Sequence, residues 1–172
     1  MSYVDDYPLS GFRFQVDFKE QMLTNDIEGG EVLLCSGAFS ECSGLEVTME
    51  PKTIKEGGRN WGAAQRMGAI SFGTVVLKRG LTNTDDLWTW FNLVGEGAYA
   101  QRLNVTITMF DQSGKSIFSW KLLKAMPIKF KAPDLNASNN EVAIEELHLV
   151  HEGLGRATVA GKQLGNVLGN EL

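Results

Sequence analysis

The two histidines, His148 and His151, are the side chains best suited to bind a metal ion or to transfer a proton. They lie in residues 142–151, whose composition predicts a β-strand. Successive side chains of a strand point to opposite faces, so two residues three positions apart cannot share a metal ion. We therefore expect satisfied or solvent-facing histidines and no metal site.

Residues 155–162 have an order of glycine and lysine similar to that of a phosphate-binding loop. Such a loop has four residues between its two glycines, and a Ser or Thr after its lysine binds magnesium. Here five residues separate Gly155 from Gly161, and Gln163 follows Lys162. The match fails on both counts, and we predict no phosphate site.

Two pairs of adjacent acidic residues are the remaining candidates for acid–base chemistry. Asp85 and Asp86 stand at the expected start of a helix, where acidic groups complement the helix dipole. Glu145 and Glu146 are explained by the edge of a strand. Because neither pair needs a role in proton transfer, we predict no catalytic, cofactor-binding or metal-binding residue. The chain is expected to use no cofactor and not to be an enzyme.

Size and composition favour one globular domain that is made in the cytoplasm. The 172 residues can bury a sizeable core, with 43% hydrophobic and 22% charged residues. A net charge of −5 argues against a nucleic-acid partner. No apolar run approaches the roughly 20 residues of a membrane span, and the acidic N-terminal sequence is unlike a signal peptide. Cys35 and Cys42 are too few for a disulfide framework and are not spaced as zinc ligands, so we expect free thiols.

Residues 70–94 carry the clearest structural pattern, a strand followed by the one strong helical period. Every second residue from Ile70 to Val76 points the same way, as in a strand. Gly80 breaks this run, and Asn83 or Thr84 is expected to cap the helix. The apolar stripe of the helix consists of Leu87, Trp90, Phe91 and Val94.

The rest of the sequence predicts mainly short strands. Alternating or apolar runs predict strands at residues 12–18, 32–35, 39–42, 45–49, 103–109, 118–122, 126–131 and 142–151. The last of these is expected to contain a bulge near Glu145 and Glu146, where the alternation slips. Seven or more strands with one helix predict an antiparallel β-sandwich or barrel.

Residues 52–68 differ in kind, because they combine four glycines with several charged groups. Their flanking strands could pair directly, which predicts an extended hairpin or long loop that projects from the body. Long loops in compact domains are usually functional or disordered. The indole of Trp61 indicates that something packs there.

The adjacent basic residues Lys78 and Arg79 allow two interpretations. They form either a solvated turn that needs no function or a contact with a partner beside the aromatic helix. The sequence pattern leaves both open.

Several ordered segments are shared with one protein family. They are residues 7–16 (YPLSGFRFQV), 39–47 (FSECSGLEV, close to F-S-E-x-S-G-L-E), 56–60 (EGGRN, close to E-G-G-x-N), 76–80 (VLKRG) followed by 86–90 (DLWTW), 104–108, and 145–154 (EELHLVHEGL). Together they cover most of residues 7–154. The chain thus resembles the tube proteins of contractile injection systems and contractile phage tails, which share their fold with the haemolysin-coregulated protein of type VI secretion.

The resemblance implies a subunit that forms six-membered rings, which stack into a hollow tube. Its partners would be further copies of itself, the sheath protein, baseplate and spike proteins, and cargo in the lumen. The particle would be assembled in the cytoplasm and could be released as a phage-tail-like particle. Contacts between subunits or rings are expected at Lys55, Glu56, Arg59, Asn60, Trp61, Lys78 and Arg79.

Two alternatives stay open. The loop at residues 19–37 is longer than usual for the family, and the chain continues past residue 154. We therefore divide it into a tube-protein domain (1–154) and a C-terminal extension (155–172), and keep a tube initiator that joins the spike complex to the tube as one alternative. The more distant alternative is a small-ligand-binding β-barrel.

Overall fold

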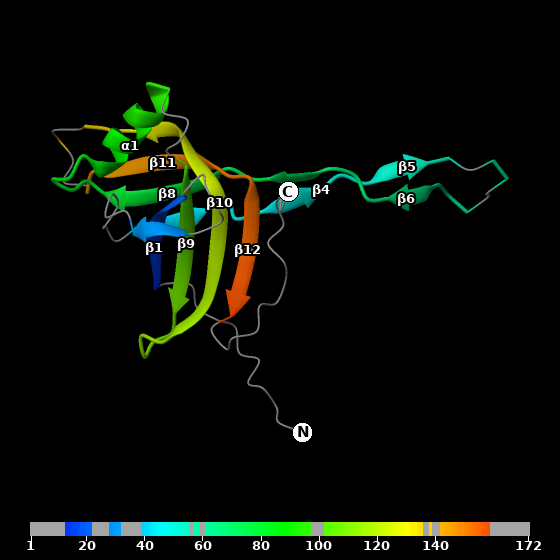
Figure 1. Cartoon of the computed structure of the whole chain (residues 1–172), viewed down its shortest axis with the longest axis horizontal. Helices are drawn as coiled ribbons and strands as arrows, with labels where there is room; N and C mark the ends of the chain where they lie inside the picture. The colour runs from blue at the N-terminus through cyan, green and yellow to red at the C-terminus, as the bar shows by residue number, and fades with distance from the viewer. Residues whose placement is uncertain are drawn as a thin grey trace.

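The computed structural model describes residues 13–21, 28–31, 39–55, 57–58, 61–97, 102–135, 138 and 142–158. Across these residues the chain forms antiparallel strands and one α-helix (Figure 1). The predicted fold class, mainly β with one helix, is confirmed.

The elements follow one another in a simple order. They are β1 (Phe14–Gln21), β2 (Glu28–Glu31), β3 (Glu41–Ser43), β4 (Val47–Met49), β5 (Lys52–Ile54), β6 (Ala64–Arg66), β7 (Ile70–Phe72), β8 (Val75–Gly80), α1 (Asp86–Gly95), β9 (Leu103–Phe110), β10 (Ser116–Lys131), β11 (Ile144–Val150) and β12 (Gly153–Thr158). The expected strand at residues 32–35 lies outside the described residues.

The body of the protein is one bent sheet in the order β2-β1-β9-β10-β11-β8-β3, with β12 also paired to β10. β10 belongs to both halves, because its first part pairs with β9 and β12 and its second part pairs with β11. The pairing register of β10 with β9 shifts between Leu122 and Ala125, and Lys124 has a φ of 51°. This bulge lets a single strand turn from one layer into the other. The two separate strands expected at 118–122 and 126–131 are therefore one.

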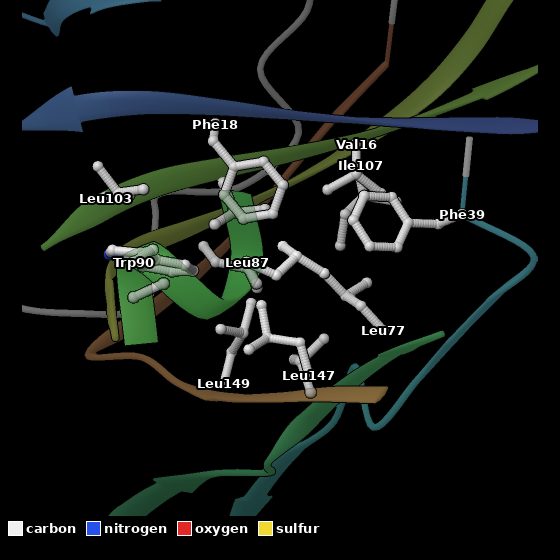
Figure 2. Packing of buried hydrophobic residues seen from close by; sticks show 14 of the residues in the cluster. Val16, Phe18, Phe39, Leu77, Leu87, Trp90, Leu103, Ile107, Leu147 and Leu149 are labelled. Carbon is white, nitrogen blue, oxygen red and sulfur yellow. The ribbon is translucent and has the colours of Figure 1, made fainter. Parts of the chain in front are cut away.

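The core fills the angle between the two halves of the sheet and is closed by α1 (Figure 2). The apolar stripe predicted for the helix contributes Leu87 and Trp90, which are fully buried. The Trp90 ring meets the Phe18 ring of β1 edge-on, with the ring centres 5.7 Å apart. This T-shaped geometry is favourable for aromatic pairs and ties the helix to the opposite layer.

The start of α1 differs from the expectation. The cap residue is Asp85, which makes no side-chain cap hydrogen bond. The Thr84 hydroxyl donates to the Asp86 carboxylate (3.2 Å) instead of accepting a backbone N–H. The prediction of an Asn83 or Thr84 cap was wrong because Asp86 draws both Thr84 and a buried arginine toward its carboxylate.

The expected bulge near Glu145 is also wrong. β11 pairs with β8 in unbroken register from Ile144 opposite Gly80 to Leu149 opposite Val75. Glu145 lies on the same buried face as Leu147 and Leu149, so the alternation is regular and includes a charged residue.

Two strand boundaries also differ from the expectations. The strand predicted from Ile70 is divided into β7, which pairs with β4 outside the main sheet, and β8, because the chain enters the main sheet between them. Residues 142–151 do not form the last strand, since β12 follows them and pairs with β10.

Candidate functional site

A two-stranded ribbon, here called the arm (residues 47–72), projects from the body (Figure 1). β4 pairs with β7 next to the body, and β5 pairs with β6 farther out. The Glu50 N–H donates to the Ala69 carbonyl (3.2 Å) and joins the two pairs into one hairpin. The expectation of an extended hairpin projecting from the body is confirmed.

Two glycines allow the strands of the arm to pass close to each other. At the base, Gly44 has a φ of +82°, and a Cβ there would lie 2.0 Å from the Thr74 carbonyl oxygen. Halfway along, a Cβ on Gly68 would lie 1.9 Å from the Glu50 carbonyl oxygen. Any side chain at these positions requires the backbone to move, so the path of the arm is fixed by glycine.

The proximal half of the arm has one apolar face. Val47 pairs with Phe72 and Met49 pairs with Ile70, so the four side chains share a face. Val47, Met49 and Ile70 are exposed. A two-stranded ribbon is only marginally stable by itself in water. Phe72, at the base of this face, packs against the body, and the other three side chains stay exposed.

The distal half of the arm is basic. Lys52 lies directly opposite Arg66, and like charges in this position destabilise a strand pair. Within the described part of the chain neither side chain makes an ion pair. On the other face, the Thr53 hydroxyl donates to the Gln65 side-chain oxygen (3.2 Å).

The tip of the arm presents Trp61, which is 95% exposed, whereas the exposed Met67 (81%) lies nearer the middle of the arm, next to Gly68. Lys55, the residue after β5, is also exposed. Glu56, Arg59 and Asn60 lie outside the described residues. The arm thus brings Trp61 and Lys55 to one end of the molecule, far from the body, and their role as contact residues stays a prediction.

Lys78 and Arg79 are neighbours on β8, so their side chains point to opposite faces of the sheet. Lys78 faces outward, and its Nζ lies 3.0 Å from a carboxylate oxygen of Glu41 on β3. The hydrogen bond to Glu41 raises the pKa of Lys78 and outweighs the opposing effect of desolvation. Lys78 is accessible from outside and remains a candidate contact residue.

Arg79 points inward and is 1% exposed. Its Nη1 donates to Asp86 (3.1 Å), Nη2 donates to the same carboxylate, and Nε donates to Glu145. Burial by itself lowers the pKa of Arg79, but the hydrogen bonds to both carboxylates outweigh burial and raise it. The structure therefore places Arg79 inside the body, where it anchors the start of α1 to β8 and β11, and not at a surface.

The remaining reactive groups serve packing. The His151 ring lies against Phe72, with ring centres 5.1 Å apart, and its Nδ1 is 2.9 Å from the Gly153 carbonyl oxygen. Burial lowers the pKa of His151, and burial raises the pKa of the Cys42 thiol to about 11. Cys42 is free, and Cys35 lies outside the described residues. Among the described residues no group of three or more His, Cys, Asp or Glu side chains could hold a metal ion.

Residues 10–155 match the family model described as "T4-like virus tail tube protein gp19". The match covers most of the chain, so the protein belongs to the tail tube family. No curated protein sequence is significantly similar to it. In the part of the chain that the structure describes, the helix α1 is not long and apolar enough to cross a membrane.

Solved structures agree with this family. A chain in the anti-feeding prophage (AFP) baseplate is 27% identical, with a TM-score of 0.73, and covers 89% of this chain and 97% of its own. A chain in the sheath–tube complex of the extracellular contractile injection system PVC has 19% identity, the same TM-score and coverages of 90% and 95%. Hcp1 from E. coli EAEC 042 has a TM-score of 0.51 at 11% identity, with coverages of 91% and 97%. The two matches of lower identity show the shared fold. The chain is thus a tube protein of the contractile injection class.

Proposed function

We propose that this tube subunit closes into rings of six, that the rings stack into a hollow tube, and that the arm makes the contacts between neighbouring copies. The exposed apolar face of the arm carries the proposal. A ribbon that leaves such a face in water gains its stability by packing on another chain. Contacts between two different surfaces of identical chains produce closed rings or open filaments.

The free edges of the sheet fit the same assembly. β2, β3 and β12 each pair on one side only among the described strands. Unpaired edges are sites at which another chain can add a strand. A sheath protein outside the tube, spike and baseplate proteins at its end, and cargo inside it are the further partners that we propose. We also propose that the particle is assembled in the cytoplasm.

Electron microscopy of the purified chain tests the proposal. The full chain is expected to give rings or tubes, and a variant in which the whole arm, residues 47–72, is replaced by Asn-Gly is expected to remain monomeric; this turn keeps Glu46 opposite Gly73, as in the full chain. Circular dichroism and thermal unfolding of the short variant check that its body still folds. Tubes from the short variant would contradict the role of the arm, and a monomeric full chain would contradict the assembly.

A second candidate function is that of a tube initiator at the baseplate. It is supported by the 27% identity to a chain of the AFP baseplate, compared with 19% to a chain of the PVC sheath–tube complex. An epitope-tagged copy in the assembled particle separates the two candidates. Immunogold label along the whole length indicates the repeating subunit, whereas label at one end indicates the initiator.

A further inference from the structure

A groove of about 400 Å³ crosses the outer face of the sheet where β3, β8 and β11 lie side by side. Its charged lining includes the carboxylates of Glu41, Asp134 and Glu146. Lys78 and Lys131 also line it, so one negative charge is in excess. Lys131 lies between two of these carboxylates, 3.4 Å from Asp134 and 3.9 Å from Glu146.

The groove is also lined by apolar side chains. Three of them are exposed, Leu135 (89% exposed), Val142 (77%) and Ile144. A groove with both apolar and charged side chains is suited to bind an aromatic anchor whose flanks are charged, because the ring is desolvated while the charges pair.

The groove and the arm lie at opposite ends of the sheet. β8 begins at Val75, next to the base of the arm, and ends at Gly80. The groove lies around this far end, where Ile144 pairs with Gly80 and Glu146 pairs with Lys78. Figure 1 shows the arm pointing away from this end of the body. The arm of one chain therefore does not reach the groove of the same chain.

The two surfaces are chemically complementary. Residues 52–66 contain four basic side chains and one acidic one, a net charge of +3, while the whole chain carries −5, which leaves −8 for all other residues. The basic side chains Lys52 and Arg66 face each other without an ion pair in the described residues, and a nearby carboxylate would relieve their repulsion. Trp61 supplies the aromatic anchor.

We propose that the groove is the receptor for the distal arm of a neighbouring copy. The indole of Trp61 packs among Leu135, Val142 and Ile144, and the basic arm lies against the carboxylates. Since arm and groove are at opposite ends, every copy binds one neighbour and is bound by another, so the contact propagates from head to tail. This inference rests on the proposed function and names the surface that the arm binds.

Photo-crosslinking on assembled particles tests the receptor. Trp61 is replaced by benzoylphenylalanine, isotope-labelled and unlabelled chains are mixed, and the crosslinked peptides are sequenced after tryptic digestion. We expect a crosslink between a labelled and an unlabelled chain, from position 61 to the peptide of residues 132–156. The same group at Lys115, on an exposed turn, is expected not to crosslink to this peptide.

The outcomes separate the two proposals. Particles whose crosslinks from position 61 lie in another peptide, or that give none, overturn the groove as receptor and leave the tube assembly intact. A full chain that forms no particles overturns both.

If the photoreactive group itself prevents assembly, two surface variants test the proposed receptor instead. Leu135→Asp is expected to raise the lowest concentration that gives particles at least about tenfold, whereas Leu81→Asp, also exposed at this end of the sheet, leaves it unchanged. Equal effects of the two variants overturn the proposal.

Discussion

The body and the arm of this protein differ in whether their apolar side chains are buried within the chain. The body buries its apolar side chains between the two halves of a bent sheet and a helix, and even its buried charges are paired. The arm has the same secondary structure, but its apolar side chains beyond Phe72 and the basic pair Lys52 and Arg66 are largely exposed. The comparison teaches that the body buries its apolar side chains within one chain, whereas the arm leaves apolar side chains exposed, which is the basis of the proposal that a second chain packs on it.

Two tryptophans provide the largest expected contrast. Trp90→Ala removes a fully buried side chain and is expected to lower the free energy of unfolding by about 3–5 kcal/mol. Trp61→Ala, alone or with Arg59→Ala, is expected to change it by less than about 0.5 kcal/mol and to impair assembly. Urea unfolding of the monomer and electron microscopy measure the two effects. Tubes of normal length from the Trp61→Ala variant would mean that the arm does not contribute to the assembly contacts.

Two adjacent basic residues on β8 give the second contrast. Arg79→Ala leaves the buried carboxylate of Glu145 without its partner, and we expect a loss of about 3 kcal/mol in the free energy of unfolding. Lys78→Ala removes only a surface pair with Glu41 and is expected to leave the unfolding midpoint almost unchanged. Thermal unfolding of both variants checks this. Equal destabilisation would mean that the Arg79 pairs do not anchor α1.

Two glycines of the arm give the smallest contrast. A Cβ on Gly68 collides with the Glu50 backbone, while a Cβ on Gly57 near the tip meets nothing within 4 Å. Gly68→Ala is expected to destabilise the arm by about 1–3 kcal/mol and to reduce assembly, and Gly57→Ala to do neither. Hydrogen exchange of the arm amides and particle yield are the measurements. If the two variants assemble equally well, the close approach at Gly68 is not needed for assembly.

Much of the body could be predicted from local patterns. The alternation in β1 and β9 and the helical stripe with Leu87 and Trp90 follow from the periods of strand and helix, because burial on one face imposes these periods. The projecting hairpin could also be predicted, since the strands that flank residues 52–68 pair directly. Family motifs supplied the class of protein, which the family match confirms.

The position of Arg79 could not be predicted in this way. Its partner Glu145 is 66 residues away in sequence, and an interior arginine next to a surface lysine has no local signature. For the same reason the buried Glu145 looked like a slip in the strand pattern. The groove likewise joins residues from β3, β8, β10 and β11, which only the sheet order brings together.

The sequence by itself determined most strands of the body, the helix, the basic hairpin and the family, because each is encoded by neighbouring residues. Only the tertiary structure decided which charges are internal, how β10 joins the two layers, and where the arm points. These depend on contacts between distant segments, whose geometry is fixed when the sheet closes over the core.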